Sequence, residues 1–488
     1  MLFHSQPFIL VFLPLCLTGL ALVGRWFGAA WALAWLVGAS LLFHAWGNQA
    51  HTLLMLGSIA GNHAIGRRIH RLAQVGQATR ARSWFRIGLA GNLLLLVWFK
   101  YADFLRGIVA PGLPALEIAL PLAISFFTFQ QIMFLADCRD PSAPLPRLLP
   151  YTAFVAFFPH LIAGPLVRPR AIVPQLARTN LSRLTAANLE AGMILFLLGL
   201  GKKLVLADMF GGFADTGFAA AEHGAALTLL EAWAATLSYA LQIYFDFSAY
   251  SDMATGLARM VGVHFPLNFD SPYQARTITD FWRRWHITLG LFLREHVYIP
   301  LGGNRAGLAR QLAALLLTML LAGLWHGAGW RFVLWGGMHG VMLAGHLLYR
   351  RRAGPMPGRM AQTLTLFGVV LAWVPFRAPD LPAAWAMTRG LLGLNGCAIP
   401  AMIVSAFPPL RHIASAVPVL PALGDARTLA LPEVLSCLLL GWLIVLVMPH
   451  AQALSERAKA IALTAGFALT VQALFFAPEV APFLYFRF

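Results

Sequence analysis

Two histidines stand in aromatic segments where an imidazole has few charged neighbours. His326 lies in "GLWHGAGW" (323–330), within an apolar run whose single formal charge is Arg331, and His286 ends the segment "TITDFWRRWH" (277–286). A neutral imidazole titrates near neutrality, so it can remove a proton from a hydroxyl that attacks an activated carbonyl. Acyl transfer from a thioester to an alcohol needs little beyond such a base, an oxyanion donor and a dry, shaped channel.

The position of His326 favours a functional role. An ionisable residue inside a membrane segment is costly, and it is by default a candidate functional residue. Glycines on both sides allow close backbone approach and leave room for a guest, and two tryptophans can form the walls of a narrow slot; these neighbours are Gly323, Gly327, Gly329, Trp325 and Trp330. The alternative is a buried core histidine that is satisfied by a backbone carbonyl.

The segment around His286 has the periodicity of an amphipathic helix, with Thr279 or Asp280 as the N-cap. At 100° per residue, one arc holds Phe281, Trp282, Trp285 and Leu289, with His286 at its edge and Arg283, Arg284 and Asp280 opposite. We therefore expect a helix along the membrane interface, with its arginines toward headgroups and the histidine toward the protein interior. Ordinary interfacial anchoring by tryptophan and arginine, with a solvated histidine, explains the same pattern.

Other polar residues of the apolar segments have simpler explanations. His339 and His346 are expected to be structural, and Asp246 and Asp252 to be helix-end residues. The four cysteines form no CxxC pair, so neither a disulfide framework nor a thiolate metal site is indicated.

Composition places the chain in the membrane. Of its 488 residues, 59% are hydrophobic and 11% are charged, whereas about 25% are charged in soluble domains. The net charge of +17 comes mainly from arginines at the ends of apolar segments, which is the pattern of loops that face anionic headgroups and not that of a nucleic-acid binder. The N-terminal run has no basic region and no cleavage site, so we expect it to be a retained span.

About 20 apolar residues are needed to cross the hydrocarbon, which predicts roughly ten to twelve elements. The candidates are 7–24, 27–46, 49–65, 87–105, 115–136, 188–208, 226–249, 310–324, 328–349, 363–378, 434–449 and 460–478. The segment 154–166 is interrupted by two prolines and is expected to be bent or re-entrant. The arginine-rich loop 66–86 is predicted to be cytoplasmic, which places the N-terminus outside, in the periplasm.

No internal repeat divides the chain, so a single membrane domain over 1–488 is the simplest organisation. It comprises N-terminal spans (1–110), a core that holds the motifs (115–350) and C-terminal spans (360–488). The stretch 390–432, rich in Pro and Gly, is the plausible extramembrane insertion.

Five blocks of the sequence carry a resemblance to a known family. They are "SFFTFQQIMFLAD" (125–137), "FFPHLIAGPLVRPR" (157–170), "QIYFDFSAYSDMATGLA" (242–258), "NFDSPYQARTITDFWRRWHITLGLFLREHVYIPLGGNR" (268–305) and "LLAGLWHGAGWRFVLWGGMHG" (320–340). The sequence resembles the membrane-bound O-acyltransferase (MBOAT) family. Within it, the similarity is to the bacterial branch that includes the alginate O-acetylation membrane protein and the teichoic-acid D-alanylation protein.

The resemblance implies a fold and a site. The fold would be all-α and polytopic, a ring of helices around a central tunnel. The family's active histidine corresponds to His326, expected to act as general base, and a second family histidine to His286, which would orient it, share the proton or bind the donor. We expect the tunnel for substrate and donor to be lined by Trp282, Arg283, Trp285, Tyr298 and Trp325. Arg283 and Arg284 would hold anionic groups of the donor, although headgroup contact explains them equally well.

The implied function is O-acetyl transfer for an exported polysaccharide such as alginate or cellulose. The acetyl groups would come from a cytoplasmic thioester, acetyl-CoA or another acyl thioester, with no bound cofactor and no metal. The protein would lie in the bacterial inner membrane, in contact with lipid. A periplasmic or membrane-anchored partner acetyltransferase would complete the transfer to the exopolysaccharide.

Two other classes share some of these features. A polytopic transporter of a lipid- or polysaccharide-linked substrate would also have polar residues at mid-membrane, but paired acids and repeated halves are not visible in the sequence. A haem or metal oxidoreductase would place histidines in facing pairs, for which the spacing of His339 and His346 is a weak signal.

Overall fold

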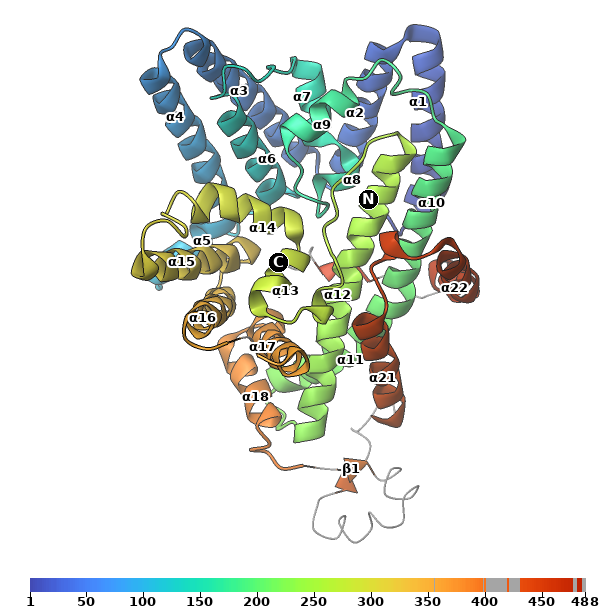
Figure 1. Cartoon of the computed structure of the whole chain (residues 1–488). Helices are drawn as coiled ribbons and strands as arrows, with labels where there is room; N and C mark the ends of the chain where they lie inside the picture. Colours follow the sequence, from blue (N-terminus) through green and yellow to red (C-terminus); the bar gives the residue numbers. More distant parts are fainter. Residues whose placement is uncertain (355, 398, 401–418, 421–430, 477–480, 485–488) are drawn as a thin grey trace. The chain divides into compact units, whose positions relative to one another are not determined.

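Helices make up nearly all of the regular structure. A computed structural model describes residues 1–354, 356–397, 399–400, 419–420, 431–476 and 481–484 (Figure 1). Within this part, the strands are one parallel pair of two residues each, β1 (Ile399–Pro400) and β2 (Val419–Leu420). The all-helical class predicted from the apolar runs is therefore confirmed. Most of the predicted insertion at 390–432 lies outside the described residues.

The chain packs into two compact units. Unit 1 comprises the described residues of 1–201, 249–268 and 455–484, and unit 2 comprises those of 202–248 and 269–454. A long helix, α12 (Leu229–Met260), contributes its first part to unit 2 and its last part to unit 1. The single-domain organisation and the ring around a tunnel stay predictions.

The helices of unit 1, besides the end of α12, are η1 (Phe8–Phe12), α1 (Leu13–Phe27), α2 (Ala29–Ala45), α3 (Gln49–Gln74), α4 (Ala78–Leu96), η2 (Val97–Tyr101), α5 (Ala102–Val109), α6 (Ile124–Asp137), α7 (Leu148–Ala156), α8 (Phe158–Leu161), α9 (Pro169–Leu176), α10 (Ala186–Gly201) and α22 (Glu456–Phe476). Those of unit 2, besides the start of α12, are η3 (Lys202–Ala207), α11 (Asp208–Glu222), η4 (Pro272–Gln274), α13 (Ile278–Arg284), α14 (Ile287–Leu293), η5 (Arg294–Tyr298), α15 (Leu308–His326), α16 (Trp330–Arg352), α17 (Gly358–Arg377), α18 (Leu381–Leu391), α21 (Leu431–Val447) and η7 (Ala451–Ala453).

Five described helices are long and apolar enough to cross a membrane. They are Phe8–Phe27, Ala78–Val109, Leu308–His326, Trp330–Arg352 and Gly358–Arg377. The bent pair Glu456–Thr464 and Gly466–Phe475 would make a sixth, and Ala29–Ala45 and Val434–Val447 are apolar but shorter. The number is below the predicted ten to twelve because several apolar runs form short, broken or partly polar helices. The chain is a multi-pass helical membrane protein.

In unit 1, α3, α4 and α6 lie side by side (Figure 1). Asn62 of α3 and Asn92 of α4 exchange amide hydrogen bonds of 2.6 and 3.3 Å. Polar side chains that satisfy each other in this way join helices inside a membrane. A Cβ on Gly88 of α4 would lie 2.6 Å from Leu135 of α6, so the absence of a side chain permits this close approach.

The segment 154–166 is broken as the sequence predicts. Helix α7 ends at Ala156, and α8 holds only four residues. The backbone of residues 162–168 is not helical. Pro159 stands at the start of α8, where its missing N–H is no loss, and Pro165 prevents the helix from continuing. This irregular backbone is buried among other side chains, as membrane depth requires.

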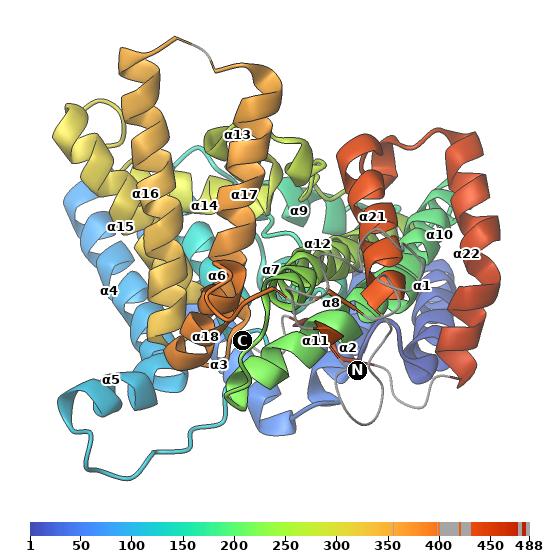
Figure 2. The same ribbon diagram turned by 90° about the horizontal axis from the view of Figure 1, so that it is seen from below.

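In unit 2, α15 and α16 form a tight antiparallel hairpin, with α17 beside α16 (Figure 2). Glycines of α16 allow its backbone to approach that of α15 closely. A Cβ on Gly336 would lie 2.3 Å from the carbonyl oxygen of Met319, and one on Gly340 would lie 2.8 Å from Leu316. The hairpin places His326 at the end of α15, directly before the turn.

Candidate active site

His286 lies at a break between two short helices. Helix α13 ends at Arg284 and α14 begins at Ile287, so the continuous amphipathic helix predicted here is wrong. His286 occupies the left-handed region, with φ at +44°, which is strained for a residue with a Cβ. The predicted N-cap is also displaced, because the Thr277 side chain accepts the Asp280 N–H at 3.1 Å. The break turns the His286 side chain into the protein, where it is 1% exposed.

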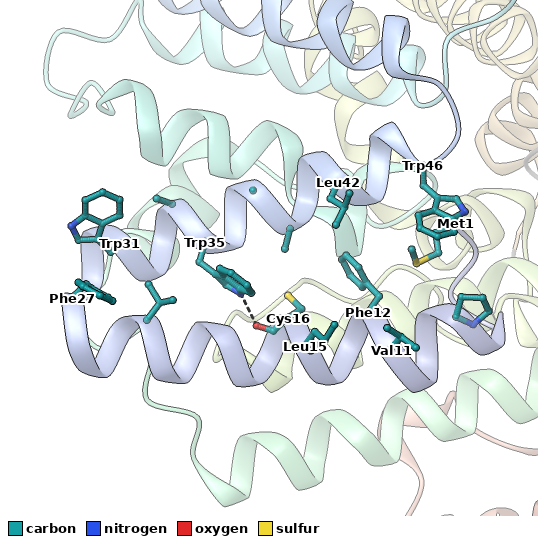
Figure 3. A pocket seen from close by; sticks show the side chains of 15 residues that line it. Met1, Val11, Phe12, Leu15, Cys16, Phe27, Trp31, Trp35, Leu42 and Trp46 are labelled. Atoms are coloured by element: carbon teal, nitrogen blue, oxygen red, sulfur yellow. Dashed lines mark hydrogen bonds between the residues drawn. The ribbon is translucent and has the colours of Figure 1, made fainter.

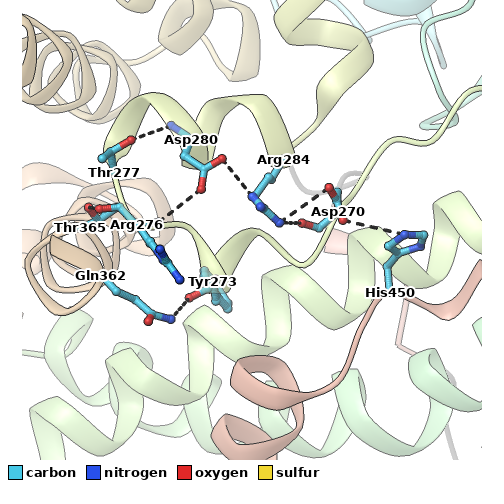
Figure 4. A network of polar contacts seen from close by, with 9 residues as sticks. All are labelled: Asp270, Tyr273, Arg276, Thr277, Asp280, Arg284, Gln362, Thr365 and His450. Carbon is cyan, nitrogen blue, oxygen red and sulfur yellow. Dashed lines mark hydrogen bonds and ion pairs between the residues drawn. The ribbon is translucent and has the colours of Figure 1, made fainter. Parts of the chain in front are cut away.

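A polar network anchors α13 (Figure 4). Arg284 donates to Asp280 at 3.0 Å and to the carbonyl oxygen of Asp270 at 3.2 Å, and Asp280 also accepts the N–H of Arg276 at 3.3 Å. Thr365 of α17 donates to the Arg276 carbonyl oxygen at 3.4 Å. These contacts fix the segment before His286 from both sides. They also engage Arg284 in ion pairs within the protein.

His326 is enclosed by aromatic rings. It is the last residue of α15 and is 7% exposed. Its ring centroid lies 4.8 Å from Trp325, 5.1 Å from Trp335 of α16 and 5.1 Å from Phe376 of α17. These side chains exclude water from the imidazole, and in such a site each electrostatic contact with a reacting group is stronger than in solution.

Trp325 connects the two candidate histidines. Its ring centroid lies 4.8 Å from His326 and 6.2 Å from His286. His286 in turn packs on Phe247 at 4.8 Å and Phe269 at 6.2 Å. The fold thus gathers both imidazoles, which lie 40 positions apart in the sequence, around one indole. Two titratable rings in a dry aromatic surrounding can share acid–base work on a single substrate.

The other two predicted tryptophans belong to the same cluster. Trp282 lies 5.8 Å from Trp335 and donates a hydrogen bond from Nε1 to Nδ1 of His339 at 3.3 Å. Trp285 is buried and packs 5.0 Å from Trp373 of α17 and 5.2 Å from Phe269. Both rings therefore reinforce the walls around the histidines. Their role in a tunnel stays a prediction.

Two predicted residues lie apart from this cluster. Tyr298 ends η5, and its hydroxyl accepts a hydrogen bond from Gln311 at 3.3 Å. Because Gln311 precedes His326 by 15 residues on α15, Tyr298 lies about 22 Å along the helix from the histidine. Arg283 is exposed on α13. A donor role for either residue stays a prediction.

Sequence reasoning missed several members of the cluster. His339 is fully buried and accepts the Trp282 hydrogen bond, and Trp335 and Phe376 flank His326. A signal was present on α16, because Trp335 and His339 are four residues apart and share a face. Phe376 comes from another helix, α17, and no local pattern indicates its place beside His326.

A buried ion pair lies in the same unit. Lys203 of η3 contacts Asp246 at 2.9 Å and Asp208 at 2.7 Å, and Lys203 and Asp246 are 1% and 2% exposed. Asp246 and Asp252 lie within α12, so the prediction that they end a helix is wrong. Asp246 precedes Phe247, which packs on His286. The ion pair therefore holds the part of α12 that supports this histidine.

The described residues contain no group of three or more His, Cys, Asp or Glu side chains placed to hold a metal ion. The cluster itself offers imidazoles and aromatic walls. Such a set suits proton removal from a hydroxyl and its return to a leaving group.

Comparison with known proteins identifies the family. Residues 119–381, which contain the whole histidine cluster, match the profile of the MBOAT, membrane-bound O-acyltransferase family. The chain belongs to this family, and the predicted O-acyltransferase activity class is confirmed.

Named relatives extend over most of the chain. It is 40% identical over 433 residues to the peptidoglycan O-acetyltransferase of Helicobacter pylori, covering 82% of this chain and 81% of the relative. It is 39% identical over 407 residues to the probable alginate O-acetylase AlgI of Pseudomonas aeruginosa, covering 81% and 75%. A teichoic acid D-alanyltransferase of Bacillus subtilis is 28% identical over 236 residues, covering 46% of this chain and 58% of the relative.

Proposed function

We propose that this protein is an inner-membrane O-acetyltransferase that moves acetyl groups from a cytoplasmic thioester toward hydroxyl groups of an exported polysaccharide. The observation that carries the proposal is the pair of buried histidines, His286 and His326, on either side of Trp325. Relatives named as O-acetyltransferases of alginate and peptidoglycan support the acetyl group and a carbohydrate polymer as acceptor.

In the proposed reaction, the neutral imidazole of His326 accepts the proton of the attacking hydroxyl. The hydroxyl oxygen forms a bond to the acyl carbon, and the carbon–sulfur bond breaks. The proton then passes from the imidazole to the departing thiolate, so the histidine returns to its neutral state. His286 orients the acceptor, or stabilises the oxyanion as a donor. The aromatic walls keep water from hydrolysing the thioester.

The arrangement of basic residues supports the proposed direction of transfer. Exposed arginines cluster at the α3–α4 turn and at the end of α16, and these ends are cytoplasmic if positive loops remain inside. The donor, acetyl-CoA or another acyl thioester, would approach from that side. A periplasmic or membrane-anchored partner acetyltransferase would then complete transfer to the polymer.

The test replaces the chromosomal copy with His326→Ala or His286→Ala and measures O-acetylation of the cell's polysaccharides. His346→Ala serves as the matched control, since His346 is a partly exposed histidine of α16. We expect loss of acetyl groups in both site variants and normal acetylation in the control, with membrane abundance compared by immunoblot.

An assay with purified protein distinguishes an acyltransferase from a transporter. With a radiolabelled acetyl thioester and an oligosaccharide acceptor, an acyltransferase forms a labelled ester in detergent, where no compartments exist. A transporter moves substrate only between compartments and forms no ester. Normal acetylation by His326→Ala at normal abundance would contradict the proposed base.

A further inference from the structure

An apolar groove lies between α1 and α2 of unit 1 (Figure 3). Its volume is about 850 Å³, which is in the range of small-molecule sites. Phe27 and Trp31 close one end and Trp46 and Met1 lie at the other, and the walls between them are almost entirely apolar. The residues of α1 belong to a candidate membrane span, so the groove lies at the depth of lipid tails.

The groove is built into the two helices. On α2, Gly38 has no atom within 4 Å of where its Cβ would be, so the wall is hollow at this point. On α1, Gly19 receives the indole of Trp35, since a Cβ there would lie 2.1 Å from the ring. The Trp35 N–H donates to the carbonyl oxygen of Cys16 at 3.0 Å, as Figure 3 shows. This bond satisfies the polar end of the indole, so the floor of the groove is almost entirely apolar.

The shape of the groove suits a particular kind of ligand. The lining runs from Pro7 to Phe27 along one helix, about 30 Å at the standard rise, so the groove is long and narrow. A single extended hydrocarbon chain fits, and it restores the dispersion contacts that a void would lose.

Positive charge lies at the end that is closed by Phe27 and Trp31. Arg25 stands in the last turn of α1 and is exposed. The loop before α10 reaches the same turn, because a Cβ on Gly24 would lie 2.0 Å from Cβ of Ser182, and Arg183 follows directly. A guanidinium is well suited to a phosphate, which it can bind through two parallel hydrogen bonds.

We infer that this groove binds an anionic phospholipid, with its phosphate at Arg25 and Arg183 and one acyl chain along α1 and α2. The site is independent of the proposed transfer reaction. Tryptophans at the level of the headgroup complement it, since Trp26 and Trp31 are 68% and 63% exposed. The lipid would fasten the α1–α2 hairpin within the full-length protein.

Native mass spectrometry of the full-length protein in detergent tests the acyl-chain part, with phosphatidylglycerol as the probe. Gly38→Trp fills the groove, and we expect lipid affinity to fall about tenfold or more because several methylene groups lose their contacts. Gly345→Trp is the matched control, since this glycine of α16 also has no atom within 4 Å of a Cβ. Gly38→Val provides a smaller filling residue if the tryptophan variant does not fold.

The headgroup part is tested with Arg25→Gln and Arg183→Gln. Each should weaken phosphatidylglycerol binding about tenfold, because a charge-assisted hydrogen bond is lost. Arg82→Gln, at an exposed arginine of α4, should bind as the unchanged protein does. Inorganic phosphate alone should not displace the lipid. Unchanged binding in both Gly38 variants, or displacement by phosphate alone, would overturn the inference.

Discussion

The indole nitrogen of Trp282 donates a hydrogen bond to Nδ1 of His339 at 3.3 Å, which joins α13 to α16 behind the two candidate catalytic histidines. An indole N–H is a donor only, so Nδ1 of His339 must be unprotonated. His339 is therefore a neutral imidazole that carries its proton on Nε2. Its ring packs 4.9 Å from Trp335, which in turn contacts His326 at 5.1 Å.

Removing either end of this bond should destabilise the protein. Trp282→Phe leaves a buried acceptor and His339→Leu leaves a buried donor, and each should cost about 1–3 kcal/mol in the free energy of unfolding. The double variant should cost less than the sum, with a coupling of about 1 kcal/mol, as measured by thermal unfolding in detergent. Strict additivity of the two changes would show that the bond contributes nothing.

The ion pair of Lys203 and Asp246 should be costly to break from one side. Lys203→Met removes the cation beside the buried carboxylate of Asp246 and the partly exposed one of Asp208, and it should lower stability by about 3–5 kcal/mol. Lys203→Met combined with Asp246→Leu should recover part of this loss. Lys459→Met, which removes a pair with the exposed Glu456, should cost about 1 kcal/mol or less in the same assay. If Lys203→Met and Lys459→Met lowered the free energy of unfolding equally, burial would not be the reason for the cost at Lys203.

Arg331 should act on the site through α17. Its guanidinium donates to the carbonyl oxygens of Phe376 and Ala378, at the helix end that carries the ring beside His326. We expect Arg331→Met to lower stability by about 1.5–3 kcal/mol, because charge-assisted bonds are lost, and to reduce acetyl transfer. Arg331→Lys should restore part of both. Arg350→Met, at the other end of α16, should leave transfer per protein molecule unchanged; a loss there as large as at Arg331 would show that capping of α17 is not the cause.

Gly327 and Gly329, in the turn after His326, should differ sharply in how well they tolerate substitution by alanine. A Cβ on Gly327 would lie 2.0 Å from the ring of Phe332, whereas one on Gly329 would meet its nearest atom at 3.8 Å. Both have extended backbone, so contact distance is the only difference in the argument. Gly327→Ala should cost about 1–3 kcal/mol and lower transfer, and Gly329→Ala should be tolerated. Unfolding curves and ester formation by the two purified variants measure this contrast; tolerance of Gly327→Ala would mean that Phe332 is free to move.

The sequence by itself determined the membrane class, the helical fold class and the place of His326 between two apolar runs. Apolar runs of about 20 residues exclude a soluble fold, and the candidate spans 310–324 and 328–349 leave His326 between them. The break at 154–166 was also readable, because Pro159 and Pro165 cannot continue a helix. Each of these conclusions depends on neighbours in the chain.

Only the tertiary structure decided how the site is assembled. The break at His286 has no glycine or proline to announce it, and the left-handed backbone persists because the Asp270–Arg284 network and the surrounding rings hold it. Phe376 reaches the cluster from α17, 50 positions after His326 in the sequence. Packing between helices depends on shape and on contacts across the fold, and periodicity along one helix contains neither.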